Sequence, residues 1–455
     1  MRNKYGVYCC FILTILLLTA CGKNEKPVQE GPREVVLGTA SLPSGEKDKL
    51  GRAILQFNES QSEYVVRLED TLEFTLNDDG SSSADNDQYT DATERLRIDL
   101  ATGQSGYDLL ALDDYDYYNM DIESLCKAGA FEDLNIWLDQ DGGLEREDFF
   151  NMPLTAYDQD GTLFALPAMF SFNCLKGRQA LLGDRTEWTL REFLDYTAEH
   201  PDMRITDLDI EGYMLLHLYL NGTFSFVEPD ENGELVFDEE LCADYLEFLK
   251  GVPDRRGDYA LARTGVNFNT AQLDRDYLQD TFTYIGYPSQ DRQNGYIVDT
   301  VCALSICSSS DCKEGAWAFL EFYLQYQDNT ENIIGVNTVY YPALKKQFDA
   351  AAEEILYKQW ARDENGEILL DEEGNPKMSE QRWADTYVYR AVTEEDVAFL
   401  RDFLSRGGHL QLQSTGQLYN IFAEESKAYF NDQKTLDEVM EIIKRRTLLY
   451  YEERS

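Results

Sequence analysis

Histidine is scarce in this 455-residue chain, and no common catalytic motif occurs in it. The three histidines, His200, His217 and His409, are widely separated, so no histidine-rich metal site is expected. The chain has no HExxH, no GxSxG and no Walker A sequence. Among 85 Asp and Glu residues some pair will always resemble the carboxylates of a glycosidase, so their abundance is no argument for hydrolysis. We therefore expect no enzymatic activity, no metal and no cofactor.

Basic residues are also scarce relative to acidic ones. Lys and Arg number 40 against 85 Asp and Glu, which gives a formal net charge of −45. A surface this acidic repels nucleic acid and anionic lipid headgroups, and it disfavours an anionic substrate. The chain is not of the disordered class, because 43% of its residues are hydrophobic and 13% aromatic. A body of about 425 residues exceeds one ordinary core and indicates two domains.

The cysteines form neither a metal motif nor a dense disulfide framework. Those of the body are Cys126, Cys174, Cys242, Cys302, Cys307 and Cys312. The last three are five residues apart, which is not the CxxC spacing of metal sites. Pairing of these cysteines stays an alternative, but in a chain of this length we favour buried free thiols.

No apolar run has the length of a typical membrane span. Val7 to Ala20 carries no charge but has 14 residues, whereas a spanning helix needs about 20. Arg2 and Lys4 precede this run and small residues close it, so residues 1–20 fit a secretory signal peptide. A short span followed by an incidental cysteine is the alternative.

The tetrapeptide Leu18-Thr19-Ala20-Cys21 resembles the bacterial lipobox. That resemblance implies that Cys21 is lipidated and becomes the mature N-terminus, anchored at the extracellular face of the cell membrane. One acyl chain binds a membrane only marginally, so it further implies more than one, palmitate among them. Residues 21–33 are polar and contain two prolines, which predicts a flexible tether.

The first part of the body alternates strands with helices. Strands are expected at residues 34–40, 63–69 and 107–114. Helices are expected over residues 46–61 and from Thr90 or Asp91 to Gly103. This order is typical of an α/β domain with a largely parallel sheet.

Several local signals occur further along the chain. Asp160-Gly161 predicts a hairpin turn. Thr189 and Glu192 form a capping box at a helix start, and Trp188 before it is expected to act as a hydrophobic staple. Further helices are expected in DYLEFLKGVP, in KEGAWAFLEFYLQYQ and in the closing stretch, where the second of two helices begins near Thr435.

Charged and aromatic residues outside these signals have simple structural interpretations. The acidic segments NDDGSSSADND, DENGE and DENGEILLDEEGNP lack EF-hand spacing and predict hairpin turns. Lys444-Arg445-Arg446 is expected to balance a helix dipole at a C-terminus. Trp137 and Trp317 lie in apolar patterns and are expected in a core.

In their order, several motifs resemble a known family. They are the lipobox, GYDLLALDD, SLCKAGAFEDLNIWLDQD, AYDQDGTLFALPAMFSFNCLKGRQALLGDRTEWTLREFL, YIGYP, SICSSSDCKEGAWAFLEFYL and YFNDQKTLDEVMEIIKRRTLLYYEE. Together they resemble the lipid-anchored extracellular solute-binding proteins of bacterial ABC importers, in particular the sugar-binding group of Gram-positive bacteria. The chain departs from that family at Ser289–Gly295, which follows the GYP turn where the family often has Asp-Gly.

The resemblance implies an α/β, two-lobed periplasmic-binding-protein-like fold of the class II type, with the ligand cleft between the lobes. It places lobe 1 at residues 34–168 and 289–340, and lobe 2 at residues 169–288 and 341–455. It also implies a monomer that closes on a solute, an uncharged or weakly charged oligosaccharide, and delivers it to ABC permease subunits. A surface-anchored glycoside hydrolase, a sugar-sensing lipoprotein without transport, and a peptide or other small solute are the alternatives.

The expected ligand contacts combine this resemblance with the rule that ligands lie beyond the carboxyl ends of strands. Carboxylates and hydroxyls match sugar hydroxyl groups, and aromatic rings stack on the apolar sugar face. The expected contacts are Ser41, Asp113, Asp114, Phe170, Ser171, Phe172, Tyr287 and Trp383.

Two of these assignments have alternatives. Asp113 and Asp114 are equally suited to cap the helix that follows them. Phe170 and Phe172 alternate with Ser171 along one strand, and we expect one ring to face the core and the other the cleft.

Overall fold

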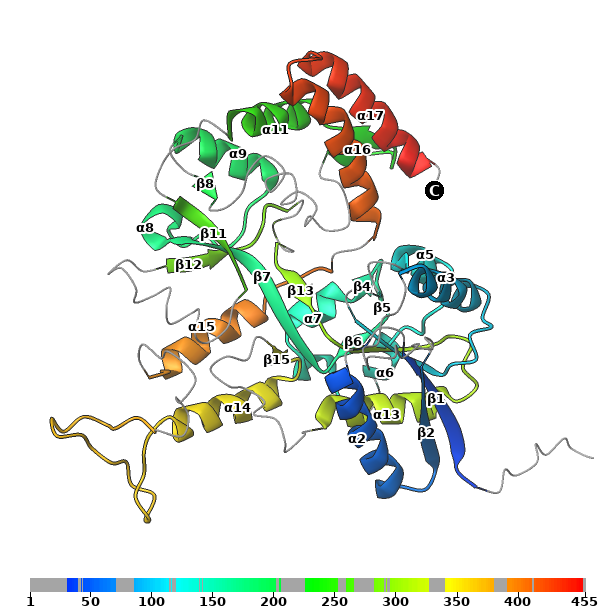
Figure 1. The fold of residues 1–455 in the computed structure, drawn as a ribbon, viewed down its shortest axis with the longest axis vertical. Helices are drawn as coiled ribbons and strands as arrows, with labels where there is room; N and C mark the ends of the chain where they lie inside the picture. Colours follow the sequence, from blue (N-terminus) through cyan, green and yellow to red (C-terminus); the bar gives the residue numbers. More distant parts are fainter. Residues whose placement is uncertain are drawn as a thin grey trace, which may run out of the picture.

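Two groups of helices and strands, joined through the long strand β7 (Met169–Arg178), make up the molecule in the computed structural model (Figure 1). The structure describes residues 31–39, 42, 44–70, 86–113, 116, 120–138, 140, 142–201, 204–205, 226–252, 259–265, 282–289, 292, 295–326, 340–379, 391–410 and 413–452. In this part of the chain no helix combines the length and the apolarity that crossing a membrane requires.

The first sheet has five strands in the order β2-β1-β3-β14-β6. Their bounds are β1 (Arg33–Thr39), β2 (Tyr64–Asp70), β3 (Leu109–Leu112), β6 (Leu166–Pro167) and β14 (Ala303–Ile306). β1 runs parallel to both β2 and β3, as the strand–helix alternation predicts. β14 runs antiparallel to β3 and β6, so a segment from far along the chain completes the sheet.

The helices of the first group cover this sheet. They include α2 (Ser44–Ser60), α3 (Asn86–Ala101), α5 (Ile122–Lys127), α6 (Asn135–Leu138), α7 (Asn151–Ala156) and α13 (Lys313–Gln325). The second predicted helix is expected to begin at Thr90 or Asp91. That start is wrong, because α3 begins at Asn86. Asn86 and Asp87 are residue types as suited to a helix start as Thr90 is.

The first hydrophobic core lies between this sheet and its helices. All four residues of β3 are buried, and Phe57 of α2 meets Phe319 of α13 with ring centroids 5.4 Å apart. Trp137 stacks on Trp317 at 5.7 Å and packs against the same core, as predicted for both.

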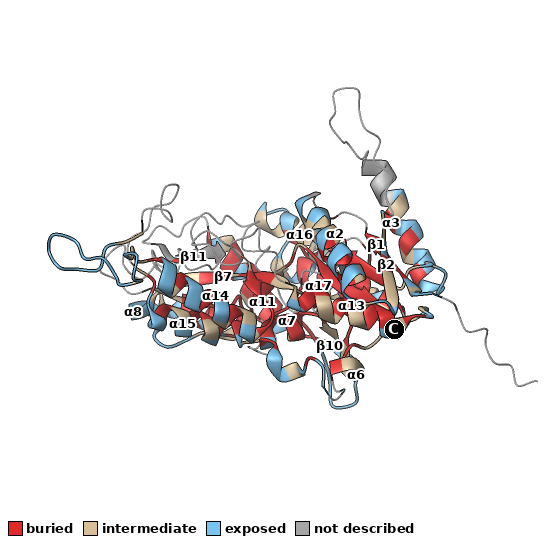
Figure 2. Ribbon diagram, turned by 90° about the horizontal axis from the view of Figure 1, so that it is seen from below, coloured by how far each residue is buried: buried red, intermediate tan, exposed pale blue. Residues whose placement is uncertain are grey.

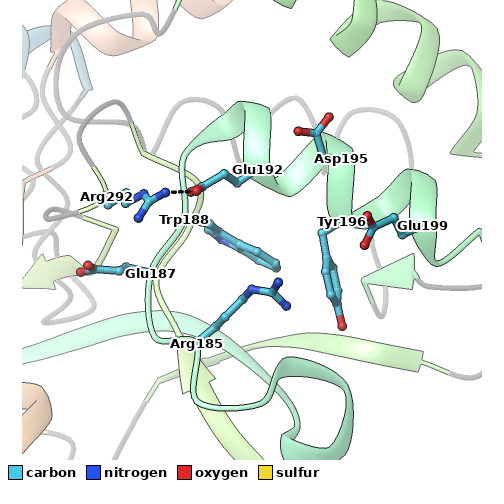
Figure 3. A pocket seen from close by; sticks show the side chains of 8 residues that line it. All are labelled: Arg185, Glu187, Trp188, Glu192, Asp195, Tyr196, Glu199 and Arg292. Atoms are coloured by element: carbon cyan, nitrogen blue, oxygen red, sulfur yellow. Dashed lines mark hydrogen bonds and ion pairs between the residues drawn. The ribbon is translucent and has the colours of Figure 1, made fainter.

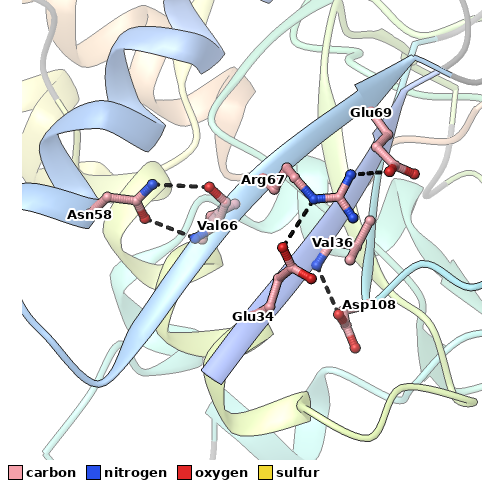
Figure 4. A network of polar contacts seen from close by, with 7 residues as sticks. All are labelled: Glu34, Val36, Asn58, Val66, Arg67, Glu69 and Asp108. Carbon is pink, nitrogen blue, oxygen red and sulfur yellow. Dashed lines mark hydrogen bonds and ion pairs between the residues drawn. The ribbon is translucent and has the colours of Figure 1, made fainter. Parts of the chain in front are cut away.

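Polar side chains finish the edge of the first sheet at β2 (Figure 4). Asn58 of α2 donates to the carbonyl of Val66 at 3.0 Å and accepts from its N–H at 2.8 Å. An edge strand whose N–H and C=O groups are paired in this way offers few free backbone groups for pairing with a strand of another chain. Arg67 binds both Glu34 and Glu69 across the outer face of the two strands.

The second sheet is built around β7. β12 (Phe282–Ile285), β11 (Tyr259–Gly265), β13 (Ile297–Asp299) and β15 (Tyr341–Pro342) all pair antiparallel with it, and β8 (Arg204–Ile205) pairs with β11. The helices of this group are α8 (Gln179–Leu182), α9 (Leu190–Glu199), α11 (Glu239–Gly251), α16 (Gln413–Phe430) and α17 (Leu436–Glu452). They enclose a second core that includes Trp188, Leu246, Phe422 and Ile443.

The remaining elements are several short segments and two further helices. They are η1 (Arg146–Asp148), β4 (Asp158–Gln159), β5 (Thr162–Leu163), β9 (Val227–Pro229), β10 (Leu235–Phe237), α14 (Lys345–Lys358) and α15 (Glu394–Leu404). Phe348 of α14 and Leu400 of α15 belong to the first core, whereas Phe422 of α16 and Ile443 of α17 belong to the second. The lobe boundaries at residues 168, 288 and 340 stay a prediction.

The signals predicted at the starts of α9 and α17 are confirmed. The Thr189 hydroxyl accepts from the Glu192 N–H at 3.2 Å, and the Glu192 carboxylate accepts from the Thr189 N–H at 2.9 Å. The Trp188 ring meets Phe193 at 5.2 Å, which is the geometry of a hydrophobic staple. Glu438 and Thr435 make the same reciprocal pair at the start of α17.

The predicted role of Lys444-Arg445-Arg446 is wrong, because α17 continues to Glu452 and has no basic residue in its last turn. Lys444 instead pairs with Glu239 at the start of α11. Arg446 pairs with Glu424 and Glu425 of α16. These ion pairs are partly exposed, so each contributes about 1 kcal/mol or less to stability.

The predicted hairpin turns are confirmed at the Asp160-Gly161 turn between β4 and β5 and at the described acidic segments. Asp230, Asp363 and Asp371 each begin a turn and accept backbone N–H groups two and four residues further on. These backbone hydrogen bonds lower the pKa of each carboxyl below its usual value. The segment at residues 77–85 lies outside the described residues.

The six cysteines that the structure describes are free thiols, as predicted. Cys126 is half-buried and the other five are buried. Burial raises the pKa of the Cys126, Cys302 and Cys307 thiols to about 12. They therefore stay protonated at neutral and mildly alkaline pH. Because only the thiolate form attacks a disulfide reagent, these protonated thiols should react slowly.

We expect these thiols to react about 100-fold more slowly with Ellman's reagent in the native protein than after unfolding in guanidinium. The measurement uses mildly alkaline pH and the soluble body from residue 34 onward, which lacks Cys9, Cys10 and Cys21, so that only thiols of the body are counted. Because the native pKa values lie near 12, the slow native rate should persist as the pH rises through the range in which ordinary thiols ionise. Rapid labelling of the folded chain would contradict the burial of these thiols.

Candidate ligand cleft

The parallel strands of the first sheet end at one edge. Thr39 at the end of β1 is in register with Asp70 at the end of β2 and with Ala111 of β3. Asp113 comes directly after β3 and therefore lies at the same edge. In Figure 1 this edge faces the middle of the molecule, where β7 begins. Such an edge is where open α/β sheets bind ligands.

Asp113 takes part in the turn that follows β3. Its Oδ1 accepts from the Asp116 N–H at 2.9 Å, and its own N–H donates to the Asp116 carboxylate at 3.3 Å. The helix expected after Asp113 falls mostly on residues outside the described ones, so its capping by Asp113 stays a prediction. The side chain is half-buried, whereas Asp116 is fully buried. Its contact with a ligand stays a prediction.

Two short connections link the first sheet to the second. Ala168 alone separates β6 from β7, and Thr300–Cys302 separates β13 from β14. The two connections lie side by side, because the Thr300 hydroxyl donates to the carbonyl of Met169 at 3.0 Å. Two adjacent short segments between two sheets are the kind of element that can absorb hinge rotation.

The start of β7 is enclosed by its neighbours. Phe170 is in register with Tyr341 of β15, and Phe172 with Val298 of β13. Phe170, Ser171 and Phe172 are 0%, 4% and 0% exposed. Both phenylalanines belong to the first core, so the expectation that they face opposite ways is wrong. Residues two apart on a strand share a face.

The second sheet is shared between the two cores. Cys174 and Leu175, neighbours on β7, belong to the first and second core respectively. The same alternation occurs at Tyr284 and Ile285 of β12. Strands of the second sheet therefore contribute residues to both cores, and the two short connections join this shared sheet to the first sheet.

Tyr287 lies away from these residues, in the second core, and is 1% exposed. Its N–H donates to the Gly295 carbonyl at 2.6 Å. Gly286 and Gly295 touch here, and a Cβ added to Gly295 would lie 2.4 Å from the Tyr287 carbonyl oxygen. Only glycine fits such a backbone approach.

The other predicted residues, Cys21, Ser41, Asp114 and Trp383, lie outside the described residues.

A cavity of about 260 Å³ lies on the second group of elements, between α9 and the loop that precedes it (Figure 3). Its lining residues are Arg185, Glu187, Trp188, Glu192, Asp195, Tyr196, Glu199 and Arg292. The Arg185 guanidinium lies 4.9 Å from the Tyr196 ring centre, and Arg292 pairs with Glu192. Sequence reasoning missed this cavity, although Asp195 and Glu199 at helical spacing indicate a shared face of α9.

No family model and no curated protein matches the chain. Among solved structures, it is similar to the sugar-binding protein MalE from Xanthomonas citri, with 12% sequence identity and a TM-score of 0.52. That match covers 92% of this chain and 98% of the other. A periplasmic oligogalacturonide binding protein from Yersinia enterocolitica matches with 14% identity, coverage of 92% and 99%, and a TM-score of 0.51.

These similarities extend over most of the chain and show its fold. The chain has the two-lobed α/β fold of solute-binding proteins, so the predicted fold class is confirmed. At this level of identity the similarity shows the fold alone, and the ligand has to be argued from the site.

Proposed function

We propose that this protein is the substrate-binding lipoprotein of an ABC transporter. It captures an extracellular solute, an oligosaccharide, by closure of its lobes and delivers it to permease subunits in the membrane. The observation that carries this proposal is the pair of adjacent short connections, Ala168 and Thr300–Cys302, that join the first sheet to the second. Rotation there would bury a ligand held at the carboxyl edge of the first sheet.

The proposed contacts remain Ser41, Asp113, Asp114, Phe170, Ser171, Phe172, Tyr287 and Trp383. Among those that the structure describes, Asp113 has the largest exposed fraction at this edge. A carboxylate there can accept hydrogen bonds from sugar hydroxyls. The scarcity of basic residues agrees with an uncharged or weakly charged ligand, since an anion would meet a surface of like charge.

The anchor completes the proposal. Residues 1–20 act as the signal peptide, Cys21 carries the lipid, and residues 21–33 form the tether. Lobe 1 spans residues 34–168 and 289–340, and lobe 2 spans residues 169–288 and 341–455. A monomer held in this way at the extracellular face of the cell membrane stays beside its permease.

Binding without chemistry is testable with the soluble body and a panel of neutral oligosaccharides. A glycan that binds only the folded state, present at a free concentration of 100 times its Kd, should stabilise the protein by about 2.7 kcal/mol. This stabilisation raises the melting temperature. Calorimetry on the glycans that shift the melting temperature then gives the Kd. Anionic oligosaccharides of equal length serve as controls and should produce smaller shifts.

Release of reducing ends from any bound glycan would contradict the proposal and support the glycoside hydrolase instead. Absence of binding across the panel, with peptides binding in its place, would overturn the ligand class but leave the transport role standing.

A further inference from the structure

A projecting arm, Trp360–Ser379, follows the end of α14. Figure 1 shows it extending from that helix away from both sheets, and Figure 2 shows it standing clear of the body and exposed along most of its length. Residues 367–377 are all exposed. The arm therefore contributes nothing to either core.

Backbone hydrogen bonds hold the arm in shape without a core. Ala361 N–H donates to the Lys377 carbonyl, Lys377 N–H to the Leu369 carbonyl, and Leu369 N–H to the Ala361 carbonyl, each at 2.8 Å. Three short segments thus pair with one another in a ring. The two turns that join them contain Gly366 and Gly374 with φ of +83° and +88°, a backbone conformation that favours glycine.

The base of the arm is braced against α14. The Arg362 guanidinium lies 3.9 Å from the ring centre of Tyr357, in the last turn of that helix. Arg362 also donates to the Gly366 carbonyl at 2.7 Å. The arm therefore has a defined structure, which holds the side chains of its middle segment in fixed positions at the surface.

That middle segment carries three consecutive apolar side chains. Ile368, Leu369 and Leu370 are 38%, 42% and 59% exposed. They are not needed to close the turns, which depend on aspartate, glycine and backbone groups. Scattered single apolar residues are ordinary on a surface, but a contiguous run on a projecting element is typical of an interaction site.

The charge around this run indicates which partner can cover it. The acidic residues of the arm are Asp363, Glu364, Glu367, Asp371, Glu372 and Glu373, and its basic residues are Arg362 and Lys377. The whole chain carries −45 as well. A second copy, an anionic membrane or a nucleic acid would each bring like charge against the arm. A partner with basic residues has the complementary charge.

We propose that the Trp360–Ser379 arm is a docking surface for another protein, whose contact face has an apolar groove flanked by Lys and Arg. Ile368 and Leu370, which are two residues apart on the strand-like middle segment and share a face, enter the groove, and the acidic turns lie against the basic flanks. This contact is separate from the ligand cleft and does not depend on which solute the protein binds.

The test places a photoreactive benzophenone amino acid at position 370 of the full chain in the cells that produce it. Irradiation is expected to give an adduct with one protein, identified by mass spectrometry, that has more Lys and Arg than Asp and Glu on its extracellular part. That protein is then purified and its Kd for the full chain is measured at low and high salt. Binding should weaken at least about tenfold in high salt, because flanking charges contribute to it.

Matched substitutions decide whether the arm carries the contact. Ile368→Gln with Leu370→Gln should weaken binding of the purified partner at least about tenfold. Leu55→Gln with Leu449→Gln changes two side chains that are 64% and 50% exposed elsewhere, and it should leave the Kd unchanged. Unchanged melting temperatures of both variants show that each body is folded.

Four results would overturn the proposal: no adduct at position 370, an adduct with lipid, an adduct with a second copy of the chain, or equal Kd values for the two double variants.

Discussion

Replacing Trp188 by alanine is expected to lower the free energy of unfolding by about 4 kcal/mol, the usual range for a buried tryptophan. The indole is 1% exposed and packs on Phe193 and Tyr196 with ring centroids 5.2 and 5.9 Å away. Its Nε1–H donates to the Gly286 carbonyl at 2.9 Å. Alanine would leave a large cavity in the second core and a buried carbonyl without its donor. Urea denaturation followed by circular dichroism measures the loss.

Trp188→Phe separates the two contributions. Phenylalanine keeps an aromatic ring against Phe193 but removes the donor to Gly286, so we expect a loss of about 1–3 kcal/mol. Leu55→Ala on the exposed face of α2 is the matched control and should change stability by about 0.5 kcal/mol or less. A Trp188→Ala protein within 1 kcal/mol of the parent would show that the staple is not a stabilising part of the second core.

Replacing Asp113 by asparagine is expected to weaken ligand binding by about tenfold to a hundredfold, the effect of losing hydrogen bonds to a charged acceptor. Asparagine keeps an oxygen that can accept from the Asp116 N–H, so the turn after β3 should be retained. What it removes is the negative charge and one acceptor oxygen at the edge of the first sheet. Calorimetry with the glycan found in the panel measures the Kd of both proteins.

The control for Asp113→Asn is Asp99→Asn on α3. Asp99 is exposed and lies on a helix instead of the carboxyl edge, so the same chemical change there should not alter the Kd. Equal affinities of the parent and Asp113→Asn proteins, with equal melting temperatures, would remove Asp113 from the binding site and reduce its role to capping the turn.

Features that depend on a few neighbouring residues could be predicted from the sequence. The capping box at Thr189 and Glu192, the staple at Trp188 and the Asp160-Gly161 turn each involve side chains within five residues of one another. Their interaction partners are fixed by helix or turn geometry before any tertiary contact forms. The alternation of strands and helices at the start of the body is local in the same sense, and it predicts the parallel pairing of β1 with its neighbours.

The errors in prediction concern residues whose partners lie elsewhere in the chain. Lys444 and Arg446 resemble a helix C-terminus in the sequence, but α17 continues, and they pair with α11 and α16. Phe170 and Phe172 are expected to face opposite ways, but β13 and β15 cover the strand and both rings belong to the first core. No pattern within their own segments distinguishes these outcomes.

The sequence by itself therefore determined the class of the chain, an acidic α/β protein of two bodies with capped helices and buried thiols. Composition and local spacing express these properties directly. Only the tertiary structure decided that β14 enters the first sheet antiparallel, that one sheet serves both cores, and that the Trp360–Ser379 arm stands free of the body. The physical reason is that strand pairing and burial are set by contacts between distant segments, which local propensity does not encode.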